Sequence, residues 1–285
     1  MQDRDEPVGI THDTRNTQDF WSEMQVSRDA RQKLLRTTEV ISGMIDRAVA
    51  QNPNLYPDDY QHGIFPRLGQ RPDFHQHDVL THIVAVEEAL RSGEAAEEFS
   101  EGVRPELKRR LMVRPSDDSL TYYELALIAG RMHDVGKLLE DRRPFDLKDP
   151  FAGQDKKRPK EPIAGLPFAG KSHFEIGRTI ISQKLMGILT SEEVKVVTGA
   201  LNVHQRIQKE IEKIIDGREG VPEAVREIER NTGADKVLIG TLVAMADSLG
   251  KGEPKQESEQ SKTQKQVTKN LCLVMISRVL ERTEG

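Results

Sequence analysis

Three helix starts can be recognised in this sequence, and they constrain its fold more than any other feature. In each, a serine or threonine is followed three residues later by a glutamate: Thr121 with Glu124, Ser172 with Glu175, and Thr190 with Glu193. This pairing is typical of the capping box, in which the two side chains bond the first free backbone N–H groups of a helix. Apolar residues at helical spacing follow each pair, and no stretch alternates as a half-buried strand would. The sequence therefore predicts an all-α fold.

Apolar stripes mark further helices and divide the chain into segments. One stripe runs over 79–90, another ends at Gly250, and residues 206–232 look helical with an interruption at 217–222. Composition and periodicity together predict the following division: a disordered N-terminus at 1–16, an N-terminal helical extension at 17–73, a main helical domain at 74–250 with a long loop at 141–171, a flexible linker at 251–267, and a C-terminal helix at 268–285.

Bulk composition excludes several classes of protein. A chain of 285 residues can bury a core without disulfides or metal, so a metal here would be functional rather than structural. The single cysteine and the polar start predict a cytoplasmic protein, and no apolar run approaches the ~20 residues of a membrane span. The formal charge of −5 argues against a general nucleic-acid binder, although 142–171 holds eight basic against four acidic residues. Nucleic acid is therefore not the favoured partner.

An adjacent histidine and aspartate, His133-Asp134, follow an apolar helix and precede Val135-Gly136-Lys137. Neighbouring residues on a helix point about 100° apart, so this pair can share an ion only where other helices add ligands. His82 and Asp247 lie beside apolar stripes and are the candidates. A carboxylate among apolar residues is expensive to bury, and a cation removes that cost.

The order His82, His133-Asp134, Asp247 resembles the signature of the HD superfamily of metal-dependent phosphohydrolases, over about residues 74–250. The resemblance implies an HD-domain helical bundle in which these four residues hold a metal ion. His173, in His-Phe-Glu-Ile-Gly, and His204 are similar to histidines of the HD-GYP branch, where they would serve a second ion bridged by Asp134. The chain lacks that branch's Gly-Tyr-Pro motif and carries the additional 141–171 segment, so cyclic dinucleotides are not the favoured substrate.

The expected cofactor and roles follow from the ligand chemistry and the resemblance. Imidazole with carboxylate favours a transition metal such as Mn, Fe, Co, Ni or Zn, and we expect two ions. The expected substrate is a nucleotide or another phosphate ester, hydrolysed at Asp134 with Lys137. Substrate contacts are expected from these basic residues: Lys137, Arg142, Arg143 and Lys171. His75 and His77 are more simply explained as part of a polar loop.

Two other functions stay open at this stage. A minority of the HD superfamily uses a mixed-valence di-iron centre as an oxygenase, and oxygen-reactive iron without phosphatase activity would indicate that chemistry. A non-catalytic HD module that senses a nucleotide or binds a partner is the other alternative, and failure to bind metal would favour it. The sequence leaves the substrate, the metal and the oligomeric state undetermined.

Overall fold

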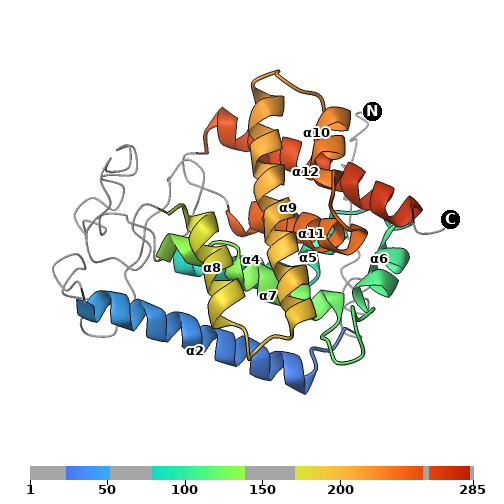
Figure 1. Ribbon diagram of the computed structural model, residues 1–285. Helices are drawn as coiled ribbons and strands as arrows, with labels where there is room; N and C mark the ends of the chain where they lie inside the picture. The colour runs from blue at the N-terminus through green and yellow to red at the C-terminus, as the bar shows by residue number, and fades with distance from the viewer. Residues whose placement is uncertain (1–23, 52–78, 139–170, 253–256, 283–285) are drawn as a thin grey trace, which may run out of the picture.

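The structure is a computed structural model that describes residues 24–51, 79–138, 171–252 and 257–282. Within these ranges every regular element is a helix, so the prediction of an all-α fold is confirmed (Figure 1). The segments predicted as a disordered terminus at 1–16 and as a long loop at 141–171 fall outside the described residues, apart from Lys171. The division into domains stays a prediction, although the boundary between the linker and the C-terminal helix differs from the predicted one.

The helices follow one another in this order: α2 (Arg28–Gln51), α4 (Val79–Arg91), α5 (Glu94–Glu97), α6 (Arg104–Leu111), α7 (Tyr122–Met132), the 3-10 helix η2 (Val135–Leu138), α8 (His173–Lys184), α9 (Ser191–Ile215), α10 (Val221–Glu229), α11 (Ala234–Gly250) and α12 (Glu259–Glu281). None of them is long and apolar enough to cross a membrane, a finding that covers only the described part of the chain.

Helix α11 is the central element of the bundle. It is buried along most of its length and packs against α4, α7, α9 and α12 (Figure 1). Its contact with α9 is close, since a Cβ on Gly240 would lie 2.6 Å from the carbonyl oxygen of Ala200. This close approach lies in the N-terminal half of α11, and further along the two helices His204 of α9 approaches Asp247 in the C-terminal half of α11. Helix α2 lies along the lower edge of the molecule, below α4, α7, α8 and α9, in the view of Figure 1.

All three predicted capping boxes are present. Thr121, Ser172 and Thr190 each accept a hydrogen bond from the backbone N–H three residues on, and the glutamate side chain in each box bonds the cap residue in return. The predicted interruption is present as well, because α9 ends at Ile215 and α10 begins at Val221. These local signals placed helix starts correctly without any knowledge of the tertiary structure.

The predicted linker at 251–267 is wrong from residue 259 onward. Helix α12 begins at Glu259, with Ser258 as its N-cap, and not at residue 268. Its first turns bury Ser261 and Thr268 and are held by ion pairs such as Lys265 with Glu257. This part of the helix is stabilised by capping and charge pairs without an apolar stripe, which is why its composition resembled a linker. The short helices α5 and α6 were also missed.

The 3-10 helix η2 packs against the start of α8 with no space for a side chain at Gly136. A Cβ built on Gly136 would lie 1.8 Å from the carbonyl oxygen of His173. The glycine is therefore required for contact between the two backbones. This contact holds the start of α8 against η2, which directly follows His133 and Asp134 in the chain.

We predict that Gly136→Ala lowers the free energy of unfolding by about 2 kcal/mol or more, because the added methyl group must separate η2 from α8. Urea denaturation followed by circular dichroism measures the change. The matched control is Gly43→Ala in α2, where the new Cβ meets nothing within 4 Å. That variant should gain up to about 1 kcal/mol from helix propensity. Equal stabilities of the two variants would contradict the close η2–α8 contact.

Candidate metal centre

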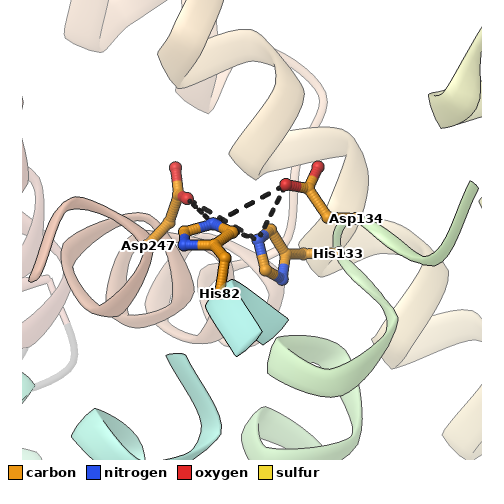
Figure 2. Close-up of side chains that lie close together, drawn as sticks. All are labelled: His82, His133, Asp134 and Asp247. Carbon is orange, nitrogen blue, oxygen red and sulfur yellow. Dashed lines mark hydrogen bonds and ion pairs between the residues drawn. The ribbon is translucent and has the colours of Figure 1, made fainter. Parts of the chain in front are cut away.

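Four polar side chains from three helical regions converge in the interior of the bundle. His82 comes from α4, His133 and Asp134 follow the end of α7, and Asp247 comes from the last third of α11. All four side chains are buried. Figure 2 shows the imidazole rings between the two carboxylates, with all four groups directed toward a common region.

The distances between these groups are those of a compact ligand cluster. The Nε2 atom of His82 lies 2.9 Å from Oδ1 of Asp247 and 3.3 Å from Nε2 of His133. Oδ2 of Asp134 lies 3.4 Å from Nε2 of His133 and 3.6 Å from Nε2 of His82. One ligand atom from each residue falls within 4.8 Å of all the others. Residues separated by up to 165 positions, such as His82 and Asp247, thus meet at one point.

Both imidazoles are oriented by backbone carbonyl groups. Nδ1 of His82 lies 3.0 Å from the carbonyl oxygen of Gly250, and Nδ1 of His133 lies 2.6 Å from that of Gly130. A carbonyl oxygen only accepts, so each Nδ1 must carry the hydrogen. The Nε2 lone pairs are left directed into the cluster, which is how metal-ligating histidines are commonly held.

The cluster has to contain positive charge. Two Nε2 lone pairs and two carboxylates this close together repel one another unless protons or a cation lie between them. Burial lowers the pKa of the His133 imidazole, but Asp134 and Asp247 outweigh burial and raise it to about 10. A divalent ion would neutralise the same group of charges.

Two lysines hold the carboxylates in their ionised form. Burial opposes ionisation, yet Lys137 and His133 keep the pKa of Asp134 well below its usual range. Lys251 and His133 do the same for the pKa of Asp247, again against burial. Lys137 forms an ion pair with Asp134, and Nζ of Lys251 lies 4.0 Å from Oδ2 of Asp247. Both carboxylates are therefore charged and able to act as ligands near neutral pH.

His204 lies at the edge of the cluster. Its Nε2 is 3.4 Å from Oδ2 of Asp247, and its ring centroid is 5.4 Å from that of His133. Burial lowers the pKa of His204, and Asp247 offsets only part of that effect, so the ring is neutral. Gln208 approaches Nε2 of His204 and Oδ2 of Asp247, each at 3.3 Å.

The remaining predicted site residues are less directly placed. His173 is the first residue of α8, and its imidazole packs against the ring of Phe174, with ring centroids 3.9 Å apart and the ring planes tilted by 39°. It is not a member of the four-residue cluster. Lys171 is exposed just before α8. Four residues lie outside the described part of the chain: Arg142, Arg143, His75 and His77.

Sequence reasoning missed Gln208, Lys251 and the carbonyl groups of Gly130 and Gly250. Gln208 follows His204 by four residues and Lys251 follows Asp247 by four, a spacing that places each pair on one helix face. This spacing in the sequence could have placed Gln208 and Lys251 beside the candidate ligands. The two carbonyl groups leave no trace in the sequence, because every residue has one.

The donor set could hold a metal ion. It offers two imidazole nitrogens whose rings are oriented by backbone carbonyl groups and two ionised carboxylates. The sequence matches no known protein-family profile and no curated protein. In the part of the chain that the structure describes, the fold and the site together define an all-helical bundle with a buried His/His/Asp/Asp group that could hold a metal ion.

We predict that metal binding releases protons. With a pKa of about 10, the His133 imidazole is protonated at about pH 8, and Nε2 can bind a metal only after that proton leaves. Binding of Co²⁺ should therefore release about one proton, and affinity should rise about tenfold per pH unit until the pH passes the pKa. Calorimetric titration in buffers of different ionisation enthalpy, such as Tris and HEPES, measures the proton count.

Two aspartate variants on α11 provide the controls. Asp247→Asn should bind Co²⁺ at least about 100-fold more weakly, because it removes a charged ligand. Asp235→Asn, at the far end of the same helix, should bind like the wild type. Affinity that does not change with pH would contradict the assignment of a displaceable proton to this cluster.

Proposed function

We propose that this chain is a metal-dependent phosphohydrolase of the HD type. The observation that carries the proposal is the convergence of His82, His133, Asp134 and Asp247, in the chain order His, His-Asp, Asp and from three helical regions, with both Nε2 atoms directed at the carboxylates. That order and that geometry together are similar to the signature and the metal site of the HD superfamily. The absence of a family match leaves this geometry as the support for the proposal.

Hydrolysis of a phosphate ester is the reaction that such a site favours. A bound divalent metal would supply a Lewis acid for phosphoryl oxygens and an activated water at neutral pH. The residues of the chain would orient the ligands and hold charge. His82 and His133 present Nε2, Asp134 and Asp247 stay ionised, and burial keeps bulk water from the cluster.

Lys137 is proposed as the residue that contacts the substrate phosphate. It follows Asp134 by three residues and forms an ion pair with it, so a positive charge lies directly beside the ligand cluster. Its side chain is 15% exposed, whereas that of Asp134 is 3% exposed. An ammonium group in this position can bind a phosphoryl oxygen as charge develops there.

We further propose a second ion held by His204 and His173. The neutral, buried imidazole of His204 beside Asp247 supports this part of the proposal. Its contact is with Asp247, whereas the resemblance implied that Asp134 would be the bridging carboxylate. The proposed substrate is a nucleotide or another phosphate ester, with further contacts from Lys171, Arg142 and Arg143.

We predict that the metal-loaded protein hydrolyses bis-p-nitrophenyl phosphate or members of a nucleotide panel, and that Asp134→Ala abolishes this activity, because the carboxylate is both a ligand and the partner of Lys137. Release of p-nitrophenol from the diester, and chromatography of the products formed from the nucleotides, measure the activity with Mn²⁺, Co²⁺ and Fe²⁺. Circular dichroism should show that the variant remains folded. Asp118→Ala, an exposed aspartate before α7, is the matched control and should keep full activity.

This assay, combined with measurements of metal binding and oxygen consumption, separates the phosphohydrolase from the two alternatives, a di-iron oxygenase and a non-catalytic module. Metal-loaded protein that binds its ions stoichiometrically but cleaves no phosphate ester would overturn the phosphohydrolase proposal. Oxygen consumption by the iron-loaded protein in that case would indicate oxygenase chemistry instead.

We predict that Lys137→Met lowers kcat/KM by about 10- to 100-fold while metal affinity changes little, because an ammonium group that stabilises charge in the transition state contributes on that scale. The comparison is with Lys195→Met, which removes an exposed lysine on α9. If kcat/KM is unchanged in Lys137→Met with metal bound, Lys137 does not contact the substrate phosphate, and its role is confined to the ion pair with Asp134.

A further inference from the structure

Helix α2 makes polar contacts with helices that carry the metal ligands. Arg131, near the end of α7, is the main junction. Its Nη1 donates to the carbonyl oxygen of Leu34 at 3.0 Å and to Oγ1 of Thr38 at 2.6 Å, both on α2. Its Nε donates to Oε2 of Glu87 on α4 at 2.6 Å. One guanidinium group thus joins α2, α4 and α7.

This junction lies close in the chain to three of the four clustered ligands. Arg131 precedes His133 by two residues, and Glu87 follows His82 by five. Glu87 is 7% exposed and also accepts from Arg91 on its own helix, at 2.9 Å from Nε. The ion pair between Arg131 and Glu87 therefore ties the helix of His82 to the helix that leads into His133 and Asp134.

Two more contacts attach α2, or the residue just before it, to α7 and α9. The backbone N–H of Ser27, just before α2, donates to Oε1 of Glu124 in α7 at 2.8 Å. Nζ of Lys33 lies 2.9 Å from Oε1 of Glu193, a fully buried carboxylate that also caps α9. Helix α9 carries His204. Polar contacts from Ser27 and the N-terminal half of α2 thus reach α7 and α9 directly, and α4 through Arg131.

We infer that α2 is a strap that sets the spacing of the ligand-bearing helices, and that Arg131 is a positioning residue for the metal site. The inference rests on the proposed metal site. A ligand set binds tightly only when its atoms are held near the coordination geometry before the ion arrives, and partners outside the ligand shell provide that restraint. Arg131 touches no ligand, so it acts through the positions of α4 and α7.

The experiment compares Co²⁺ affinity and metal-free melting temperature in variants of the full chain. Arg131→Met removes both the α2 contact and the Glu87 contact. Thr38→Val and Lys33→Met each remove one contact of α2 and leave the Arg131–Glu87 pair intact. Arg91→Met is the matched control, because Arg91 bonds the same carboxylate from within α4.

We predict that Arg131→Met weakens Co²⁺ binding by about 10- to 100-fold, the range typical for groups that orient metal ligands. Thr38→Val and Lys33→Met should each weaken it by about threefold, while Arg91→Met should change it less than about twofold even where its melting temperature falls. Arg131→Lys, which keeps a charge for Glu87, should recover part of the affinity. The Co²⁺ absorption spectrum should shift in Arg131→Met, because the ligands are no longer held in the same arrangement.

Affinity within about twofold of the wild type in Arg131→Met, together with a lower melting temperature, would show that Arg131 only stabilises the fold. Should Arg131→Met fail to fold, unchanged affinity in both Thr38→Val and Lys33→Met would overturn the role of α2. A wild-type chain that binds no Co²⁺ would overturn the metal site itself, and this inference with it.

Discussion

The burial of two carboxylates and two imidazoles at one point is the constraint on which the rest of this structure depends. Charged groups lose their hydration when they enter a protein interior, and like groups in contact repel one another. The bundle can contain this cluster only if it also supplies compensating charge and fixed hydrogen-bond partners. Lys137 and Lys251 supply charge, and the carbonyl groups of Gly130 and Gly250 orient the rings.

Close helix packing brings these partners together. A Cβ on Gly250 would lie 2.7 Å from the Val86 side chain, and one on Gly130 would lie 2.5 Å from that of Leu90. The two residues that accept from the histidine rings are thus also the points at which α11 and α7 approach α4. Packing and electrostatics are coupled here, since a larger residue at either glycine would move the carbonyl group that orients a ligand. The polar contacts of Arg131 and Lys33 extend this arrangement to α2.

Local sequence signals failed where a helix is stabilised without an apolar stripe. The first turns of α12 bury Ser261 and Thr268 and form charge pairs, so their composition was read as that of a linker. The starts of the three capped helices were predicted correctly for the opposite reason. A Ser or Thr with a Glu three residues on satisfies the first N–H groups through contacts within the same few residues, and so these helix starts need no tertiary information.

By itself the sequence determined the helical class, the starts of the capped helices and the four residues His82, His133, Asp134 and Asp247, because periodicity, capping and chain order are local or sequential properties. Only the tertiary structure decided that these residues meet within 4.8 Å, that His204 lies against Asp247, and that Gln208 and Lys251 join them. Such distances depend on how helices cross, and crossing is set by side-chain packing between segments far apart in the chain. The orientation of the rings was equally hidden, since it depends on backbone carbonyl groups that every residue possesses.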